Sequence, residues 1–406
     1  MRFRALAPLL LAVSTAHAQT RAFTGLTLID GTDRAPVRDA TIVVRDGRVV
    51  DAGAASRVAI PAGAERVSLA GKTVIPGIVN AHGHVTDADR DLRTYAAYGV
   101  TTVFSLGDEP PAVFAARAAQ NVPTLDRTRV YLAGPVLAPK TPEEARALVA
   151  RDDSLHVDVV KIRVDDNLGT TAKMAPEIWR AVIDEAHRRG LRVAVHLFYL
   201  ADAKAVLDAG ADFVAHSVRD ADVDAELIAK LKARGVCVSP TLMREVSTFV
   251  YGSTPEFFSD PFFLAHANPA WVATLRDTAR QASVRASPAA RRYRTALEVA
   301  SRNVKALSDA GVPLAMGTDT GPVGRFQGYF ELMELEYMVR AGLTPSQALR
   351  AATRDAARCM HLARDVGTIE PGKWADFVAL DADPLQDIRN VRRISSVWIA
   401  GNRVAR

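Results

Sequence analysis

Cysteine is scarce in this chain, with only Cys237 and Cys359 among 406 residues. Two cysteines cannot build the disulfide framework that holds small secreted domains together, so the fold must rest on an apolar core. Apolar residues make up 49% of the chain, which is enough for a large core. Cys237 lies in the strand-like apolar run 236–238, so we expect a buried thiol there and regard a Cys237–Cys359 bridge as the less favoured alternative.

Runs of like charge are also missing, and the net charge is only +5. A nucleic-acid-binding surface needs clustered basic residues, so this absence argues against nucleic acid as a partner. Beyond the first twenty residues, no apolar stretch reaches the length that crosses a bilayer. We therefore expect a small-molecule or short-peptide substrate, no nucleic acid and no membrane partner, and we leave a homo-oligomer open.

The N-terminal segment 1–18 has the pattern of an export signal. It begins with a short basic stretch, continues with an apolar stretch too short for a permanent membrane anchor, and ends in Ala16-His17-Ala18. Small residues at alternate positions mark the cleavage site of a secretory signal peptide. A buried N-terminal helix is the alternative, but strand and turn signals follow directly. We predict cleavage after Ala18 and a periplasmic or secreted mature protein.

Both ends of the mature chain are predicted to be β-rich. Short strand-like runs occupy 26–29, 40–44 and 48–50 near the start, and 376–380 and 396–400 near the end. The pair Asp46-Gly47 separates two of these runs, which predicts a tight antiparallel hairpin. We expect residues 19–76 and 368–406 to join in one small β-sandwich domain.

Between these ends, residues 77–367 alternate strand-like and helix-like segments. Eight apolar, β-branched runs share the strand pattern: 78–82, 101–106, 130–134, 159–164, 193–197, 213–217, 236–242 and 313–318. Helical stretches separate most of them, including 174–189, 201–209 and 222–234. Strands that alternate with helices predict a parallel sheet, and eight repeats predict an α/β fold of the (β/α)₈ TIM-barrel type. A doubly wound open sheet is the alternative, but the glycine-rich nucleotide fingerprint that would support it is absent.

The connection after the seventh run is unusually long and aromatic. Residues 243–300 contain Phe249, Tyr251, Phe257, Phe258, Phe262, Phe263 and Trp271. Long insertions after barrel strands commonly shape the substrate entrance. Either these aromatic side chains form a lid or they pack an extra helical hairpin, and the sequence leaves both open.

Two histidines, His82 and His84, stand at the end of the first predicted barrel strand. Alternate residues of a strand point to the same side, so the two imidazoles are expected to converge on one point. Gly83 between them leaves room for close approach. The pair alone is only moderately specific for a metal site, because two histidines at this spacing also occur by chance on surfaces.

Four more polar side chains lie within or directly after predicted barrel strands: Lys161, His196, His216 and Asp319. A charged or polar group that ends an apolar barrel strand is more often catalytic than structural, because that end of the barrel faces the active-site mouth. We predict that these side chains and the histidine pair, six residues from five strands, surround one site.

In these motifs the chain resembles the amidohydrolase superfamily, and specifically its binuclear branch of prolidase-like and carboxypeptidase-like enzymes. The similarity covers nearly the whole mature chain, from the PGIVNAHGH segment at 76–84 to the GTIEPGK segment at 367–373. The resemblance implies two divalent metal ions, with zinc the expected element. It implies that one ion is held by His82, His84 and Asp319, and the other by His196 and His216.

The resemblance further implies that Lys161 is carbamylated and bridges both ions. An unmodified ammonium could not do this, because it offers hydrogen-bond donors and no acceptor. The alternative is a salt bridge between Lys161 and Asp319, since a buried charge must be paired in either case.

The resemblance also implies the chemistry. A hydroxide that bridges the metals would attack a substrate carbonyl, and Asp319 would be the catalytic group that takes its proton and passes it to the leaving group. The run 197–200 after His196 holds no acid, which argues against the single-metal deaminases of the superfamily. We predict hydrolysis of amide bonds in small peptides or N-acyl amino acids. A lactonase or esterase with the same site is the alternative, and a non-catalytic periplasmic binding protein is a weaker one, since no ligand is missing.

Candidate substrate-binding residues follow from the carboxylate that such substrates carry. A carboxylate needs a cation, and the arginine fork binds both of its oxygens. Arg163 is expected to share the face of Lys161, and Arg219 and Arg325 lie in the loops that follow two other predicted ligands. We favour Arg219, with Arg163 as a further candidate and Tyr199 as a hydroxyl donor. The alternative is that these arginines pair with local acids.

Overall fold

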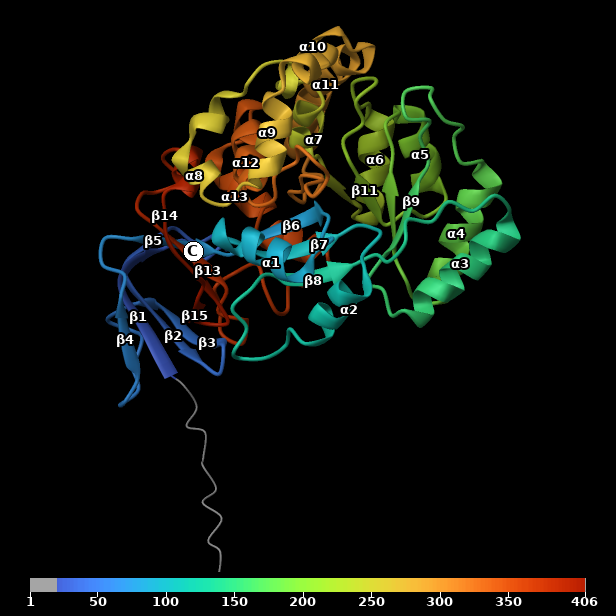
Figure 1. Cartoon of the computed structure of the whole chain (residues 1–406). Helices are drawn as coiled ribbons and strands as arrows, with labels where there is room; N and C mark the ends of the chain where they lie inside the picture. Colours follow the sequence, from blue (N-terminus) through green and yellow to red (C-terminus); the bar gives the residue numbers. More distant parts are fainter. Residues whose placement is uncertain (1–19, 406) are drawn as a thin grey trace, which may run out of the picture.

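The computed structural model describes residues 20–405, so the predicted signal peptide at 1–18 lies outside the described residues. The described chain has a β-rich part, which holds the blue and dark red strands in Figure 1, and a larger part in which strands and helices alternate. Within residues 20–405, no helix combines the length and the apolarity needed to cross a membrane.

Strands from both chain ends meet as the sequence predicts, and they share one eight-stranded sheet. A sandwich of two packed sheets stays a prediction. The strands of the sheet are β1 (Thr20–Leu28), β2 (Val37–Arg45), β3 (Arg48–Ala54), β4 (Glu65–Ser68), β5 (Thr73–Pro76), β13 (Phe377–Leu380), β14 (Ile394–Ile399) and β15 (Asn402–Arg403). Their order is β15-β14-β13-β5-β1-β2-β3, with β4 on β1. The predicted hairpin is confirmed: Asp46 and Gly47, with φ of 51° and 77°, connect β2 to the antiparallel β3.

Seven of the eight predicted barrel runs form parallel strands. One sheet contains β6 (Ile78–Gly83), β7 (Val100–Ser105) and β8 (Arg129–Leu132); another contains β9 (Val160–Arg163), β10 (Val193–His196), β11 (Phe213–Ala215) and β12 (Cys237–Ser239). The eighth run, 313–318, makes isolated bridges rather than a regular strand. Leu314 bridges to Val238 of β12, and the Ala81 N–H of β6 donates to the Met316 carbonyl at 2.8 Å. Thr320, just after the run, bridges to Gly83 of β6. The run therefore still lies between the two sheets.

Helices connect these strands as the sequence predicts. The three predicted stretches correspond to α4 (Pro176–Arg188), α5 (Leu200–Asp208) and α6 (Ala225–Arg234). The Asp224 side chain accepts from the Leu227 N–H at the start of α6, and Gly235 ends it with a left-handed φ of 62°. The other connecting helices are α1 (Ala88–Ala97), α2 (Pro111–Ala118), α3 (Pro142–Ser154), α13 (Pro345–Ala351) and α14 (Arg354–Cys359).

The aromatic insertion is helical. It comprises α7 (Leu242–Ser247), η1 (Val250–Gly252), η2 (Glu256–Ser259), α8 (Pro261–Leu264), α9 (Pro269–Arg276), α10 (Thr278–Ala286) and the start of α11 (Pro288–Asp309). Phe258 and Phe263 are fully buried and stack at 5.5 Å between ring centroids. Phe263 also meets Phe326 edge-on at 4.8 Å, ahead of α12 (Tyr329–Arg340). Several of the insertion's aromatic side chains thus pack a helical core, and a lid role stays a prediction.

Cys237 and Cys359 form a disulfide, so the expectation of a buried thiol was wrong. The bridge connects the start of β12 to the end of α14, 122 residues later. Both cysteines line a cavity with Arg192, Asp212 and Pro313, which stand at the starts of other barrel runs. The pairing depends on α14 returning to this end of the parallel strands, and a contact between such distant elements leaves no local pattern in the sequence.

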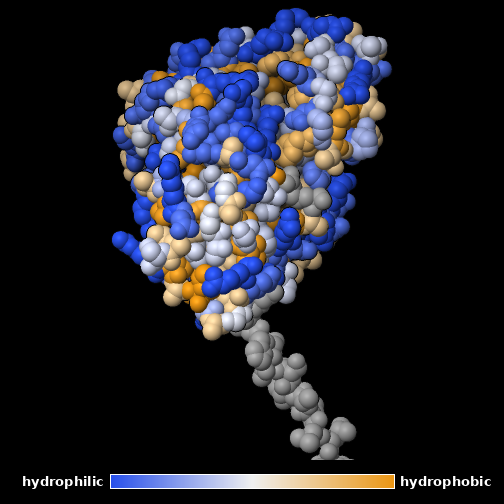
Figure 2. Space-filling model, turned by 90° about the vertical axis from the view of Figure 1, so that its left-hand side faces the viewer, coloured by the Kyte–Doolittle hydropathy of each residue, from blue (hydrophilic) through white to orange (hydrophobic). Residues whose placement is uncertain are grey.

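Hydrophilic residues cover much of the face shown in Figure 2, with hydrophobic groups between them. The exposed large hydrophobic side chains of the described chain come from widely separated segments: Val50, Val122, Leu155, Leu264 and Val323. Apolar residues scattered singly in this way are ordinary for a folded domain.

Candidate metal centre

His82 and His84 lie at the C-terminal end of β6, and Asp319 meets them from the loop after the eighth barrel run. Asp319 Oδ1 is 2.9 Å from His84 Nε2 and 3.4 Å from His82 Nε2. The backbone N–H of Asp319 donates to the His82 carbonyl at 2.7 Å, and its φ is 59°. This left-handed backbone is uncommon for a residue other than glycine, and such conformations cluster at functional sites.

A buried carboxylate behind these residues holds two chain segments together. Glu331 Oε1, on α12, accepts hydrogen bonds from Asn80 at 2.6 Å, Thr318 at 2.7 Å and Thr320 at 2.6 Å. Asn80 precedes the histidine pair, and the two threonines flank Asp319. Burial raises the pKa of Glu331 to about 7. Glu331 therefore fixes the end of β6 against the loop that carries the carboxylate.

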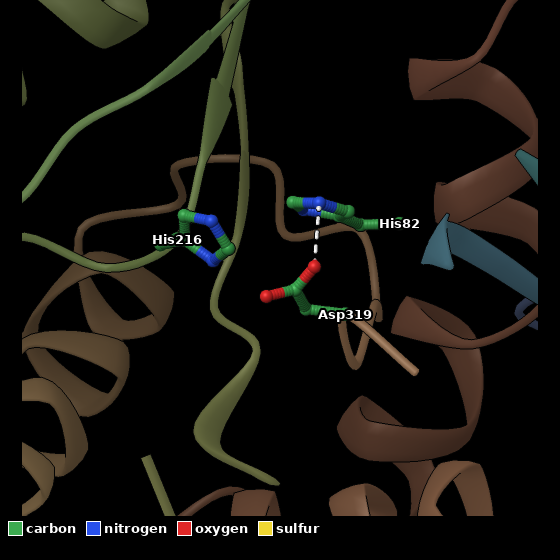
Figure 3. A group of neighbouring side chains, drawn as sticks. All are labelled: His82, His216 and Asp319. Carbon is green, nitrogen blue, oxygen red and sulfur yellow. Dashed lines mark ion pairs between the residues drawn. The ribbon is translucent and has the colours of Figure 1, made fainter. Parts of the chain in front are cut away.

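His196 ends β10, and His216 follows β11 directly. The His216 ring lies 4.3 Å from that of His196 and 4.7 Å from that of His82, measured between centroids. One ligand atom from each of His82, His216 and Asp319 lies within 4.8 Å of the other two. Figure 3 shows His216 on the opposite side of this group from His82, with Asp319 between them. The predicted ligands of both ions therefore surround one volume.

The protonation states suit a metal. Burial lowers the pKa of His82 and His196 to about 3, and it lowers that of His216 well below its usual range. Burial alone would raise the pKa of Asp319, but Arg325 and the neighbouring histidines hold it well below its usual range. Neutral imidazoles and an ionised carboxylate are the forms that bind divalent cations.

Lys161 lies in the same cluster. Its Nζ is 3.5 Å from His82 Nε2, and the residue is 4% exposed. Within the described chain, the ion pairs of Asp319 go to His82, His84 and Arg325, so the alternative of a Lys161–Asp319 salt bridge is wrong. Burial lowers the pKa of Lys161 to about 8. Roughly a tenth of the amine is then neutral at pH 7.

This donor set fits a divalent metal. His82 Nε2, 3.4 Å from Asp319 Oδ1 and 3.5 Å from Lys161 Nζ, faces the other members of the cluster. The imidazole is neutral and the carboxylate is ionised, so both can donate an electron pair to a metal. Imidazole nitrogens combined with a carboxylate are the usual ligands of catalytic zinc, which also needs at least one open position.

Arg163 is not buried with the cluster, but its charge is close enough to lower the pKa of both Lys161 and His196. It is the exposed last residue of β9, and its Nε donates to Asp165 Oδ1 at 3.1 Å. Asp165 Oδ2 in turn lies 2.9 Å from His196 Nε2. The role of Arg163 in substrate binding stays a prediction.

The other predicted substrate-binding residues are engaged within the protein. The Tyr199 hydroxyl donates to Asp166 at 2.7 Å. The guanidinium of Arg219 is buried, and its Nε lies 3.1 Å from Glu245 Oε1. Arg325 pairs with Asp319 and donates to a serine hydroxyl of α7. All three arginines therefore pair with acids, as the alternative predicts, but only Arg163 pairs with an expected local acid, Asp165. Arg219 pairs with the distant Glu245, and Arg325 pairs with the proposed ligand Asp319.

Sequence reasoning missed the residues that hold the ligands in place. Asp165 and Thr241 lie two residues beyond the ends of β9 and β12, so a search of the strand ends could also have found them. Thr241 Oγ1 lies 2.7 Å from His216 Nδ1. Glu331 lies on a helix amid an ordinary amphipathic pattern, and no local signal distinguishes it.

Comparisons with known proteins bear on the family and the fold of the chain. The model of the amidohydrolase family matches residues 73–404. The imidazolonepropionase of Streptomyces coelicolor is 27% identical over 386 residues, which cover 90% of this chain and 92% of that protein. A structure from Bifidobacterium longum, provisionally assigned as a prolidase, superposes with a TM-score of 0.78 at 26% identity and covers 96% of this chain and 95% of its own. A Xaa-Pro dipeptidase with bound methionine has a TM-score of 0.77 at 20% identity and covers 96% of this chain and all of its own.

Proposed function

Since the chain belongs to the amidohydrolase family, we propose that it hydrolyses amide bonds of small peptides or N-acyl amino acids with two divalent metal ions. One observation supports this most strongly. Ligand atoms of His82, His216 and Asp319, from three distant segments, lie within 4.8 Å of one another at the C-terminal ends of parallel strands. That end of such folds is where active sites are found.

Each ligand has a place in this proposal. His82, His84 and Asp319 hold one ion, His196 and His216 hold the other, and a carbamylated Lys161 bridges them. When bound, two such ions polarise a substrate carbonyl and lower the pKa of water towards neutrality. Zinc is the proposed element, because mixed nitrogen and oxygen donors suit it.

Lys161 is suited to carbamylation by its surroundings. The neutral amine nitrogen adds to carbon dioxide and loses one proton, which leaves a carbamate with two oxygen acceptors. The lowered pKa of Lys161 supplies that neutral amine near pH 7. The same burial gives the product a position beside His82.

Asp319 is the proposed proton carrier. Its Oδ1 faces His82 and His84, and its Oδ2 pairs with Arg325. Its low pKa keeps it ionised at neutral pH, so it can accept the proton of the attacking water and deliver it to the leaving nitrogen. The left-handed backbone at Asp319 keeps the carboxylate directed at the cluster.

The relatives favour amide bonds over esters. The B. longum structure and the Xaa-Pro dipeptidase bear names that denote peptide hydrolysis. The S. coelicolor relative, which covers 90% of the chain, is named for an imidazolone propionate, whose ring contains an amide. A lactonase or esterase on the same centre remains the second candidate, because attack on the carbonyl is shared and only the leaving atom differs.

We also propose a closed barrel for residues 77–367, flanked by a domain of residues 19–76 and 368–406. The bridges Leu137–Ile162, Val238–Leu314 and Gly83–Thr320 support closure, because together they connect the two parallel sheets on both sides. Export is proposed as well, and the Cys237–Cys359 disulfide supports it, since such bridges persist in oxidising compartments.

A substrate screen tests the proposed activity. The zinc-loaded chain 19–406 would be offered N-acyl amino acids, dipeptides, an imidazolone propionate and lactones. We expect turnover of at least one linear amide and its loss in Asp319→Asn, while Asp222→Asn, at an exposed position, keeps it. Turnover of lactones alone would favour a lactonase or esterase. Turnover of the imidazolone alone would favour a hydrolase of cyclic amides. Binding without turnover of any compound would favour a non-catalytic binding protein.

A further inference from the structure

Helices α10 and α11 carry a cluster of five exposed arginines with no acid among them. The five are Arg280, Arg285, Arg291, Arg292 and Arg294, and residues 278–297 contain neither aspartate nor glutamate. Only two of the arginines are adjacent in the sequence, so no long run of like charge marks the cluster before the chain folds. Figure 1 shows the two helices at the top of the molecule.

The charges of these five arginines are not balanced by acids of the protein. Farther along the same helix α11, the exposed Arg302 pairs with Asp222 at 2.8 Å. Within residues 20–405, by contrast, none of the five arginines forms an ion pair with a carboxylate. Neighbouring like charges repel one another, and this cost is relieved when an anion binds among them. The cluster therefore calls for an anionic ligand.

Three of the five arginines line a cleft of about 390 Å³. Arg285 comes from the end of α10, and Arg291 and Arg294 lie one turn apart on α11. The other lining residues are apolar or uncharged: Phe249, Val250, Gly252, Ser253, Val284 and Ala290. The lining thus combines three positive charges with no negative one. A water molecule takes about 30 Å³ in the liquid, so the cleft has room for a polyatomic anion.

Contacts with the protein hold the three guanidiniums at the cleft. Arg285 Nη1 donates to the Gly252 carbonyl at 2.5 Å, and Arg291 Nη1 donates to the carbonyl of the last residue of α10 at 3.0 Å. The Phe249 ring centroid is 4.4 Å from Arg294 Cζ. Each guanidinium has five N–H donors, so donors remain for a ligand on all three. A side chain that is already held binds an anion with less further loss of freedom.

The cleft is separate from the proposed metal centre, although the two are connected by packing. Phe249, at the edge of the cleft, packs in one apolar cluster with Phe198 and Tyr293. Phe198 follows the ligand His196 by two residues. None of the six proposed metal ligands lines the cleft, so a ligand bound there is distinct from the substrate at the metals.

We propose that Arg285, Arg291 and Arg294 bind a phosphoryl group in this cleft. The arginine fork matches the oxygen atoms of phosphate, and a phosphoryl group carries about 1.5 to 2 negative charges at pH 7. Three guanidiniums therefore suit it better than they suit a carboxylate, which carries a single charge. The phosphoryl group belongs to a small phosphorylated molecule or to the head group of an anionic lipid. The proposal is independent of the hydrolytic activity.

Titration calorimetry with inorganic phosphate tests the cleft on the zinc-loaded mature chain, with acetate at the same ionic strength as the comparison. We expect phosphate to bind the wild type at least about tenfold more tightly than acetate does. Arg291→Gln should bind phosphate about tenfold more weakly than the wild type, the equivalent of one charge-assisted hydrogen bond. Arg302→Gln removes one charge from the same helix outside the cleft, so this matched control should keep the wild-type affinity.

Vesicle sedimentation separates the two sources of the phosphoryl group. The wild type and both variants would be mixed with vesicles of phosphatidylcholine, with and without phosphatidylglycerol. Binding of free phosphate without sedimentation would assign the cleft to a small phosphorylated molecule. Sedimentation that requires phosphatidylglycerol, and that Arg291→Gln reduces and Arg302→Gln does not, would assign it to a lipid head group.

A second variant and two negative outcomes complete the test. Arg294→Lys keeps the charge but loses the fork, so we expect it to weaken phosphate binding less than Arg294→Gln does. Phosphate that bound only to the zinc ions would bind the wild type and Arg291→Gln alike. That result, or acetate binding as tightly as phosphate, would overturn the proposal. It would also be overturned if neither phosphate nor the anionic vesicles bound in a way that depends on the arginines.

Discussion

Burial gives His82, His196 and His216 the neutral form that a divalent metal requires of its imidazole ligands. His82 and His196 stay neutral because desolvation lowers the pKa of each to about 3, and the same effect brings Lys161 to about 8. Asp319 differs, because Arg325 and the hydrogen bonds of His82 and His84 outweigh its burial and keep it charged. At the level of single residues, the site therefore combines neutral nitrogen donors, one carboxylate and one reactive amine.

Replacing Lys161 with Ala should cost more than about 100-fold in kcat/KM, because loss of a bridging ligand exceeds the 10–100-fold cost of losing a supporting residue. Lys140→Ala, at an exposed position, should leave kcat/KM unchanged. Steady-state kinetics with the best substrate of the screen, together with the zinc content of both variants, provide the check. Full activity in Lys161→Ala would remove the bridging role.

The carbamate predicts a dependence on dissolved carbon dioxide. Metal-free protein reloaded with zinc in carbonate-free buffer should regain only a fraction of the activity that it regains with bicarbonate, because the bridge forms only when the amine captures carbon dioxide. Recovery of activity is measured against time in both buffers. Identical recovery would show that Lys161 acts unmodified.

Helix α12 supports the site at the level of elements. Glu331 fastens the end of β6 to the loop of Asp319, and Glu334, one turn later, accepts from the backbone N–H groups of Leu242 and Met243 at 2.8 and 2.7 Å. Those N–H groups open α7, where a helix leaves its donors without internal partners. Helix α12 thus holds in place both the loop of Asp319 and helix α7.

The buried Glu334 predicts a pH dependence of stability. Burial raises its pKa to about 8, above the ordinary 4.5. The folded protein then keeps a proton that the unfolded chain releases, so this contribution to stability is complete below about pH 4.5 and is lost as the pH rises through about 8. In Glu334→Gln, the decline of the unfolding free energy between pH 5 and 8 should be smaller by on the order of a few kcal/mol.

Urea unfolding at several pH values measures the effect of Glu334, with Glu298→Gln on the exposed face of α11 as the matched control. If both variants showed the same pH dependence as the wild type, Glu334 would be ionised in the folded protein and its raised pKa would be wrong.

The Cys237–Cys359 disulfide cross-links two secondary-structure elements at a distance from the metal ligands. It joins the start of β12 to α14, whereas the ligands stand at the opposite ends of the strands. Closing a segment of 122 residues should stabilise the fold by about 2–4 kcal/mol. A Cys237→Ser/Cys359→Ser double variant should therefore unfold at lower urea concentration with kcat/KM nearly unchanged. A large loss of activity in the folded variant would contradict this separation of roles.

At the scale of the whole molecule, the alternation of apolar and polar residues was sufficient to predict most of the strands and the meeting of the two chain ends. Apolar runs such as 193–197 and 213–217 became strands β10 and β11, and the ends 26–29 and 376–380 met in one sheet, because alternation and turn residues are local properties. His196, His216 and Asp319 could be predicted as site residues because the end of an apolar run is also a local property of the sequence.

Tertiary contacts account for what the sequence did not predict. The Cys237–Cys359 bridge and the pairing of Arg219 with Glu245 join residues whose neighbours in the sequence give no sign of the contact. Contacts of this kind depend on how the helices pack around the strands, which a local pattern does not record.

The gathering of six side chains around a pair of cations is measured most directly by metal content. The mature chain would be stripped with a chelator, reloaded with excess zinc and bicarbonate, freed of unbound metal and analysed by atomic emission, with His216→Ala alongside. We predict close to two zinc ions per wild-type chain and a clear deficit in the variant. One ion or none per wild-type chain, or a variant that retains two, would contradict the binuclear centre.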